Sequence, residues 1–570
     1  MQGTCHKITT CFCREAGKAL DVDSTIKEVS NKKVSSKHAL WLGKLTPPGA
    51  MLKFRPRSFL IFCWLGIALP GCLSSSQPDR PPGYLVVGLE SNPTHLDPRY
   101  ATDANSIRIG ALLFNSLTRT DQNGNLQPDL AERWETIDDR TYIFHLRKGV
   151  TFHNGKPLTA ADVAYTYRSI LDPKNRSPKR ATLQFLESVD PVGPDRVRFR
   201  LAEPYAPFLE STNLGIVPDG SRTNDGSSRQ SLIGTGPFAL EEFLPGERIM
   251  LKANANYWGG SPAVSGLIFK IIPDAIVRVL EFKKRNVDFL QNDIEPDMLP
   301  WLRDKAQASI QIAQGTTFQY IGMNLEHPIL KHREVREALA YGIDREAIIR
   351  HLLKGLAIPA TGMLSPIHWA YESSVPKFSH DPERAKRLLD QAGFHDPDGQ
   401  GPLPRFKLSY KTTNLDLRRR MAEALKQQLS EVGIELEVRT FEWGTFYADI
   451  KRGNFDLYSL SWVGITDPDI YFALFHSRNI PPNGDNRGRY RNPEVDQLLE
   501  QGRRSLGVDE RRVIYSEVQK ILARDLPYIP LWWAKNVVLT RQGIRGFIPY
   551  PDGDLISLKN VSLSFSNPEA

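Results

Sequence analysis

Cysteine is missing from most of this chain. All five cysteines of the 570-residue sequence lie at or before Cys72. Residues 73–570 therefore contain no disulfide, no cysteine-ligated zinc site and no cysteine nucleophile. A large body without thiols is suited to an oxidising compartment.

The signatures of common enzyme sites are missing as well. The sequence has no Gly-x-Ser-x-Gly turn, no phosphate-binding loop and no His-Glu-x-x-His motif. Gly234-Thr-Gly236 imitates a dinucleotide fingerprint, but residues 237–243 have the pattern of a strand instead of the required helix. Asp396 begins a calcium-like loop, but Lys407 occupies the position of the essential glutamate. We therefore predict that the protein has no cofactor and no bound metal and is not an enzyme. The sequence leaves open a pair of catalytic carboxylates.

A strong excess of positive charge is absent from the body of the protein. The formal net charge is +8, but eleven of the 73 basic and four of the 65 acidic residues lie in residues 1–71. The remainder has 62 basic and 61 acidic side chains. Nucleic-acid binding requires a basic surface, so we expect no nucleic-acid partner.

An apolar run long enough to cross a membrane is also absent, but a shorter one lies near the N-terminus. Three basic residues precede the uncharged segment 58–69, which is too short to span a bilayer and fits the apolar region of a secretion signal. Leu69-Pro-Gly-Cys72 then resembles a bacterial lipobox, with an unusual proline at its second position. We predict a lipoprotein signal; the alternative is a buried apolar helix or a signal anchor.

The predicted signal separates a leader from a mature protein. We expect translation to begin at Met51, which leaves residues 1–50 as a doubtful extension and residues 51–71 as the signal peptide. Cys72 becomes the acylated first residue, and the polar segment 72–83 becomes a tether. The mature protein is then expected in the periplasm or cell envelope, held to a membrane by its lipid.

Strand and helix patterns alternate after the tether. Residues 84–89 form an apolar run and residues 140–147 alternate between apolar and polar, as strands do. Thr159 with Asp162 is a capping-box variant that begins a helix. Residues 434–441 read as a further strand after a helical segment. This alternation predicts an α/β fold.

Several motifs in this region resemble a known family. They are Pro128–Trp134, Tyr142–Val163, Gly234–Phe238, Asn256–Trp258, Val335–Arg345, Asn492–Asp496 and Leu526–Trp532. Together they are similar to the extracytoplasmic solute-binding proteins of family 5, which are the peptide, dipeptide and nickel receptors of ABC importers. The resemblance covers essentially all of residues 84–570.

The resemblance implies a two-lobed periplasmic binding protein fold of type II-like form, with an extra small domain and a ligand cleft between the lobes. Closure about a hinge would bury the solute. The implied parts are lobe I (84–114, 234–324 and 533–570), the small domain (115–233) and lobe II (325–532).

The same resemblance places candidate ligand contacts in the cleft. Trp462 lies in a segment similar to the family's tryptophan-containing cleft loop, and Trp443 is a candidate second aromatic wall. Asn324 could present its amide near the crossing between lobes. Asn483 and Asn486, in a loop rich in proline and glycine, could line the mouth of the cleft.

One position departs from the peptide-binding members. They carry an aspartate after the cleft tryptophan that pairs with the peptide's α-ammonium, whereas Ile465 stands at that offset here. A buried ammonium without a carboxylate costs on the order of several kcal/mol. Asp467 is the nearest substitute and completes the set of candidates, and recognition of a free amine stays open.

The sequence therefore predicts a lipid-anchored, monomeric, non-enzymatic receptor. It would capture a peptide-like or other small polar solute and deliver it to the permease subunits of an inner-membrane ABC importer. Two alternatives belong to other classes: an envelope hydrolase, and a non-transport binding module with a sensor or chaperone-like role on the same fold.

Overall fold

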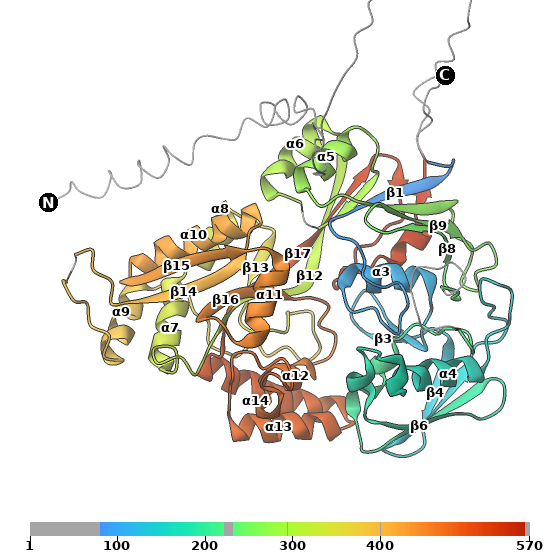
Figure 1. The fold of residues 1–570 in the computed structure, drawn as a ribbon, viewed down its shortest axis with the longest axis horizontal. Coiled ribbons are helices and arrows are strands. Elements are labelled where there is room, and N and C mark those ends of the chain that lie inside the picture. The colour runs from blue at the N-terminus through green and yellow to red at the C-terminus, as the bar shows by residue number, and fades with distance from the viewer. Residues whose placement is uncertain (1–79, 222–231, 293, 400, 565–570) are drawn as a thin grey trace, which may run out of the picture. The chain divides into compact units, whose positions relative to one another are not determined.

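The computed structural model describes residues 80–221, 232–292, 294–399 and 401–564 (Figure 1). The predicted signal, Cys72 and the tether up to residue 79 lie outside these residues. The described residues from Pro82 onward belong to one compact unit. Among the helices of the described ranges, none combines the length and the apolar character that a membrane crossing needs.

A single 11-stranded sheet runs through the described chain. Its order is β15 (Ile434–Phe441), β14 (Phe406–Thr413), β16 (Leu457–Trp462), β12 (Ala308–Met323), β17 (Tyr528–Arg541), β11 (Phe289–Gln291), β1 (Tyr84–Leu89), β10 (Gly266–Ile271), β9 (Arg248–Ala253) and β8 (Phe238–Leu244), with β13 (Ala357–Pro359) paired to β17. The pairings are mixed, since β14 is parallel to β15 and β16 whereas β12 and β17 are antiparallel.

Helices cover this sheet, and a smaller sheet forms a separate layer. The helices are α3 (Ala104–Leu113), α5 (Ala275–Lys283), α6 (Leu299–Lys305), α7 (Arg333–Gly342), α8 (Arg345–His351), α9 (Pro382–Gln391), α10 (Asp416–Ser430), α11 (Trp443–Arg452), α12 (Ile470–Phe475), α13 (Pro493–Arg504) and α14 (Val508–Asp525). The smaller four-stranded sheet contains β4 (Ala131–Thr136), β5 (Thr141–Leu146), β7 (Arg196–Leu201) and β6 (Leu186–Pro191), with α4 (Ala160–Leu171) beside it. Two short pairs complete the strands: β2 (Thr118–Thr120) with β3 (Leu126–Pro128), and β18 (Ile544–Arg545) with β19 (Ser562–Leu563).

Two long strands connect the halves of the main sheet. Residues 308–313 of β12 pair with one end of β17, and residues 317–322 pair with the other end, with a register break between them. In Figure 1 the two strands run beside each other from the region of α5 and α6 toward β13 and β16. Gly315 lies in the break, where a Cβ atom would stand 2.3 Å from the carbonyl oxygen of Ala534. Only glycine fits this close approach of two backbones.

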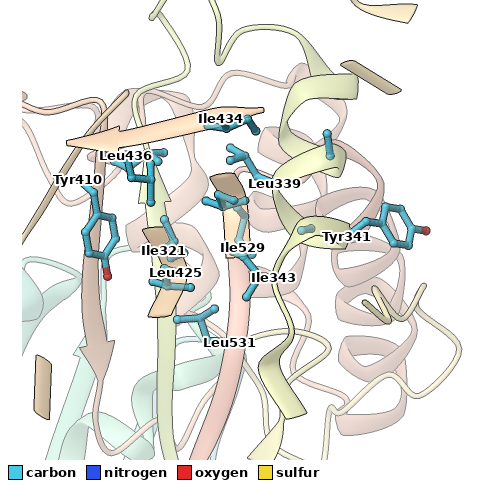
Figure 2. Packing of buried hydrophobic residues seen from close by; sticks show 14 of the residues in the cluster. Ile321, Leu339, Tyr341, Ile343, Tyr410, Leu425, Ile434, Leu436, Ile529 and Leu531 are labelled. Atoms are coloured by element: carbon cyan, nitrogen blue, oxygen red, sulfur yellow. The ribbon is translucent and has the colours of Figure 1, made fainter. Parts of the chain in front are cut away.

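The buried hydrophobic side chains form clusters that follow this division. One cluster fills the face of the sheet beneath α7, α9 and α10, and Figure 2 shows Leu339, Leu425 and Leu436 converging there. A second cluster lies on the opposite face, beneath α11, α12 and α14. Other clusters belong to the half around β1 and β10 and to the four-stranded sheet. We call the half of the main sheet around β14, β15 and β16 lobe II, the half around β1 and β10 lobe I, and the four-stranded sheet with α4 the small domain. The boundary residues given above for these parts remain predictions.

The locally predicted elements are confirmed where the described residues cover them. Strands occupy 84–89, 141–146 and 434–441, and the segment after Gly236 is the strand β8. The capping box of Thr159 and Asp162 begins α4 as expected. The predicted mixed α/β class is therefore confirmed.

Candidate functional site

The carboxyl ends of three parallel strands meet at one edge of lobe II. β14 lies between β15 and β16 and is parallel to both. The helix that follows β14, α10, belongs to the cluster on one face of the sheet, whereas α11, which follows β15, belongs to the cluster on the other. Connections that leave on opposite faces create a crevice outside the carboxyl ends of the strands, where ligands bind in open α/β sheets. This edge is therefore the candidate site.

Two predicted tryptophans lie at this edge. Trp462 is the last residue of β16, where it pairs with Phe318 of β12, and Trp443 is the first residue of α11. The Trp443 side chain is 53% exposed, which is unusual for a residue of its size. An exposed indole at a strand edge provides an apolar surface for a ligand.

The structure joins these tryptophans through two residues that the sequence did not single out. The ring of Trp443 stacks on that of Tyr447, with centroids 5.3 Å apart and planes 9° apart. The guanidinium of Arg487 lies 5.3 Å from the Tyr447 ring and 5.1 Å from the Trp462 ring. We call these four residues the aromatic–arginine stack. Its arginine is buried between two rings, and Arg487 Nη2 donates to the Tyr447 hydroxyl at 3.1 Å.

The stack contains hydrogen-bond donors without acceptors. The Trp462 Nε1 and Arg487 Nε atoms are buried, and no described residue accepts a hydrogen bond from either. Arg487 forms one ion pair, from Nη2 to Asp485 at 2.8 Å, and the Asp485 side chain is half exposed. Buried donors in native proteins normally have partners. The two free donors therefore mark the stack as a place for an acceptor group.

A buried ion pair fixes α11 to the sheet. Lys411 of β14 donates from Nζ to Asp449 of α11 at 2.7 Å, and both side chains are largely buried. The hydrogen bond from Lys411 and one from Arg452 lower the pKa of Asp449 to about 2. Asp449 is therefore charged at neutral pH, and the pair holds the helix that carries Trp443 and Tyr447.

Asp467 belongs to a different cluster from the stack. Its carboxylate accepts two hydrogen bonds from Arg511, at 3.0 and 2.7 Å, and a third from the backbone of Asp469. Asp469 in turn accepts a hydrogen bond from the Tyr205 hydroxyl of the small domain at 3.0 Å. With its oxygens engaged in this way, Asp467 connects parts of the protein and has little capacity left for a ligand ammonium.

The three asparagine candidates do not join the stack. Asn324 follows the last residue of β12, six residues and about 20 Å along the strand from Phe318, and its side chain accepts from the backbone of Glu326. Asn486 is buried, and its amide is satisfied by backbone atoms of Tyr490 and His476. Its role in the structure is to fix the loop that positions Arg487. Asn483 is exposed in that loop.

Ile465 is a residue of the hydrophobic core and not part of a polar site. Its side chain is 6% exposed and belongs to the cluster beneath α11 and α12. No described group of three or more histidine, cysteine, aspartate and glutamate side chains has an arrangement that could hold a metal ion. The chemistry at this edge is therefore that of aromatic surfaces and hydrogen-bond donors.

His368 contacts the loop that follows Trp462, and through this residue the stability of the folded protein should depend on pH. Its Nε2 lies 3.1 Å from the Thr466 carbonyl oxygen, and its Nδ1 accepts from the backbone N–H of Ala370 at 3.1 Å, so the ring is neutral. Burial lowers the pKa of His368 to about 4. Its stabilising contribution is therefore complete above the ordinary pKa of 6.5 and is lost as the pH falls toward 4.

We expect the free energy of unfolding to fall by about 1–2 kcal/mol between pH 7 and pH 5 through this residue. Urea unfolding of the wild type and of His368→Gln at both pH values measures the effect. Desolvation also lowers the pKa of the partly buried His153 to about 4, so His368→Gln should keep part of the pH dependence of the wild type. Equal pH dependence of the two proteins would contradict the assignment to His368.

The chain is similar to a known protein family and to proteins of known structure. The family model described as bacterial extracellular solute-binding proteins, family 5, matches residues 125–481. The oligopeptide-binding protein AppA of Bacillus subtilis is 31% identical over 84% of this chain and 91% of its own length. Its solved structure, in complex with a nonapeptide, superposes with a TM-score of 0.74 and 29% identity over 84% of this chain and 99% of its own.

A second solved structure is similar to the same extent. NikZ from Campylobacter jejuni, in complex with Ni(L-His), has a TM-score of 0.74 at 26% identity and covers 85% of this chain and 100% of its own. The resemblance found in the sequence and the two-lobed fold that it implied are thus both confirmed. This chain belongs to the bacterial extracellular solute-binding proteins of family 5.

Proposed function

We propose that this protein is the substrate-binding receptor of an ABC importer and captures a peptide-like solute at the carboxyl edge of β14, β15 and β16. The observation that carries the proposal is the aromatic–arginine stack, which offers an exposed indole and unpaired donors where an open α/β sheet binds its ligands. Relatives described as oligopeptide- and dipeptide-binding proteins support the choice of solute.

The remaining parts of the proposal concern location and chemistry. Acylation at Cys72 would hold the receptor at the membrane beside its permease, and the solute would leave unchanged because the protein is not an enzyme. An envelope hydrolase would need a nucleophile or a paired acid and base at the same edge. Asp449 on α11 and Asp467 in the neighbouring cluster are both engaged with cations, which favours binding over catalysis.

Thermal unfolding in the presence of short peptides tests the proposal. A ligand at a hundred times its Kd stabilises the folded state by about 2.7 kcal/mol, so a rise of several degrees in the melting temperature is expected with a set of di- to nonapeptides. Mass spectrometry of the peptides after incubation should recover them intact. Peptide cleavage would favour the hydrolase, and absence of any shift would contradict the peptide receptor.

Trp443→Ala is the informative variant, with Trp301→Ala as its control. Trp443 is exposed, so its removal should leave the unliganded melting temperature nearly unchanged while the peptide-induced shift disappears. Trp301 lies on α6, where its ring contacts Lys283, and its removal should leave the shift intact. A full shift in Trp443→Ala would remove this residue from the site.

A further inference from the structure

Three tyrosines lie on the same face of the sheet as Trp462 and extend the set of free donors. Tyr320 of β12, Tyr458 of β16 and Tyr528 of β17 are at most 6% exposed. The rings of Tyr320 and Tyr528 stack with centroids 4.2 Å apart, and the Tyr458 ring lies 5.9 Å from that of Tyr320. No described residue outside the three provides any of these hydroxyls with a hydrogen-bond partner, and the hydroxyls lie close enough to interact with one another.

Arg487 links these hydroxyls to the aromatic–arginine stack. Arg487 lies against the Trp462 ring, which shares its strand and face with Tyr458, and Phe318, the cross-strand partner of Trp462, stacks on Tyr320 with ring centroids 5.7 Å apart. The buried set therefore combines the Arg487 Nε, the Trp462 Nε1 and three hydroxyl groups, and none of these five has a described hydrogen-bond partner outside the set.

The five buried groups contain more hydrogen-bond donors than acceptors. Guanidinium and indole N–H groups donate and never accept, and the hydroxyl oxygens are the only acceptors among the five groups. If each hydroxyl oxygen accepts one hydrogen bond, three acceptors face five donors, so two buried protons stay without an acceptor. Each such unpaired donor costs about 1–3 kcal/mol. An acceptor from outside the chain removes that cost.

The carboxylates of the surrounding elements are already engaged. Asp449 is paired with Lys411, Asp467 with Arg511, and Asp485 occupies only the Nη2 of Arg487 from an exposed position. The local imbalance is therefore an excess of donors around a buried cation. Oxygen anions such as carboxylates form strong, charge-assisted hydrogen bonds with arginine, and a carboxylate is the oxygen anion that a peptide-like solute carries.

We propose that Arg487, Trp462 and the hydroxyls of Tyr320, Tyr458 and Tyr528 form a carboxylate-binding site, and that its occupant is the carboxylate end of the captured solute. The second part rests on the proposed function, whereas the site itself would also accept a small free carboxylate. The solute is thus recognised in lobe II through its acidic end and not through an ammonium group.

The first experiment tests the site with acetate. Sodium acetate replaces sodium chloride at constant ionic strength while the melting temperature of the purified full-length protein is recorded. The wild type should gain a few degrees, and Arg487→Met should gain nothing. A wild type that does not respond to acetate, or a variant that responds equally, would overturn the free-carboxylate site.

The second experiment compares trialanine with trialanine amide, which differ only in the terminal carboxylate. Because hydrogen bonds to charged groups are strong, the acid should bind roughly 10- to 100-fold more tightly than the amide. Equal affinities would overturn the assignment of the solute's carboxylate while leaving the peptide receptor intact. A response to acetate with no binding of either peptide would support the site and contradict the proposed function.

Tyr458→Phe keeps the test decisive if Arg487→Met does not fold. It removes one hydroxyl and preserves the ring, and it should reduce both the acetate response and the preference for the acid. Tyr167→Phe is the matched control, since Tyr167 is 1% exposed on α4 and its hydroxyl also lacks a described partner. Identical effects of the two variants would show that the hydroxyls act only in folding and would overturn the proposal.

Discussion

Arg511→Ala is expected to lower the free energy of unfolding by about 3–5 kcal/mol, which is typical when one partner of a buried ion pair is removed. The guanidinium binds Asp467 through two hydrogen bonds and donates from Nε to the Gly502 carbonyl at 3.1 Å. Without it, the largely buried carboxylate of Asp467 lacks its cation. Urea unfolding followed by tryptophan fluorescence measures the loss.

The neighbouring residue on α14 provides the control. Arg512 pairs with Asp509, whose side chain is almost fully exposed, and exposed pairs contribute about 0–1 kcal/mol. Arg512→Ala should therefore have little effect on stability. If Arg511→Ala destabilises the protein no more than Arg512→Ala does, the ion pair to Asp467 is not a structural tie.

The loss of unfolding free energy caused by Arg511→Ala should also depend on pH. Burial and the nearby Asp467 raise the pKa of Glu210 to about 7, and burial raises that of Asp469 to about 6. Groups with raised pKa values stabilise the folded state below their ordinary pKa, and this contribution is lost as the pH rises through the folded value. The loss of the cation should thus matter more at pH 8, where these carboxylates are charged, than at pH 5.

The sequence predicts much of the fold because its signals are local. The apolar run at 84–89 and the alternation at 141–146 depend on neighbouring residues only, and both strands form as expected. The capping box of Thr159 and Asp162 is likewise complete within four residues. Elements of this kind follow from backbone and side-chain geometry that a short window contains.

The site is only partly predictable because its partners are far apart in the chain. Trp443 and Trp462 were found through the resemblance, but Arg487, which lies between Tyr447 and Trp462, had no local signal in a loop of turn-forming residues. Asn486 in the same loop offered a polar side chain of the right type, and its amide is consumed by backbone groups. Only the folded chain shows which polar groups are satisfied.

Lys411→Met is expected to lower the free energy of unfolding by about 3 kcal/mol and to weaken peptide binding at the same time. Lys411 is the buried partner of Asp449, and the Asp449 carboxylate keeps only the exposed Arg452 when the ammonium is removed. The helix α11 then loses its main polar tie to β14. Since Trp443 and Tyr447 lie on this helix, their position relative to Arg487 should become less well defined.

The chain offers a control on the same strand and a rescue. Lys407→Met removes an exposed pair with Glu435 and should cost less than about 1 kcal/mol. The double variant Lys411→Met with Asp449→Leu removes both buried charges, and apolar replacements of this kind are often neutral. It should therefore recover most of the stability, whereas a further loss would contradict the ion-pair explanation.

The difference in the free energy of unfolding between Lys411→Met and the wild type should become smaller at low pH. The pKa of Asp449 is lowered to about 2 by the hydrogen bonds from Lys411 and Arg452, so the pair stabilises the folded state fully above the ordinary pKa near 4 and loses its effect as the pH falls toward 2. Urea unfolding at pH 7 and at pH 3 measures this change. A deficit that is constant over this range would show that Lys411 stabilises the protein through its packing against Phe441 and not through the charge of Asp449.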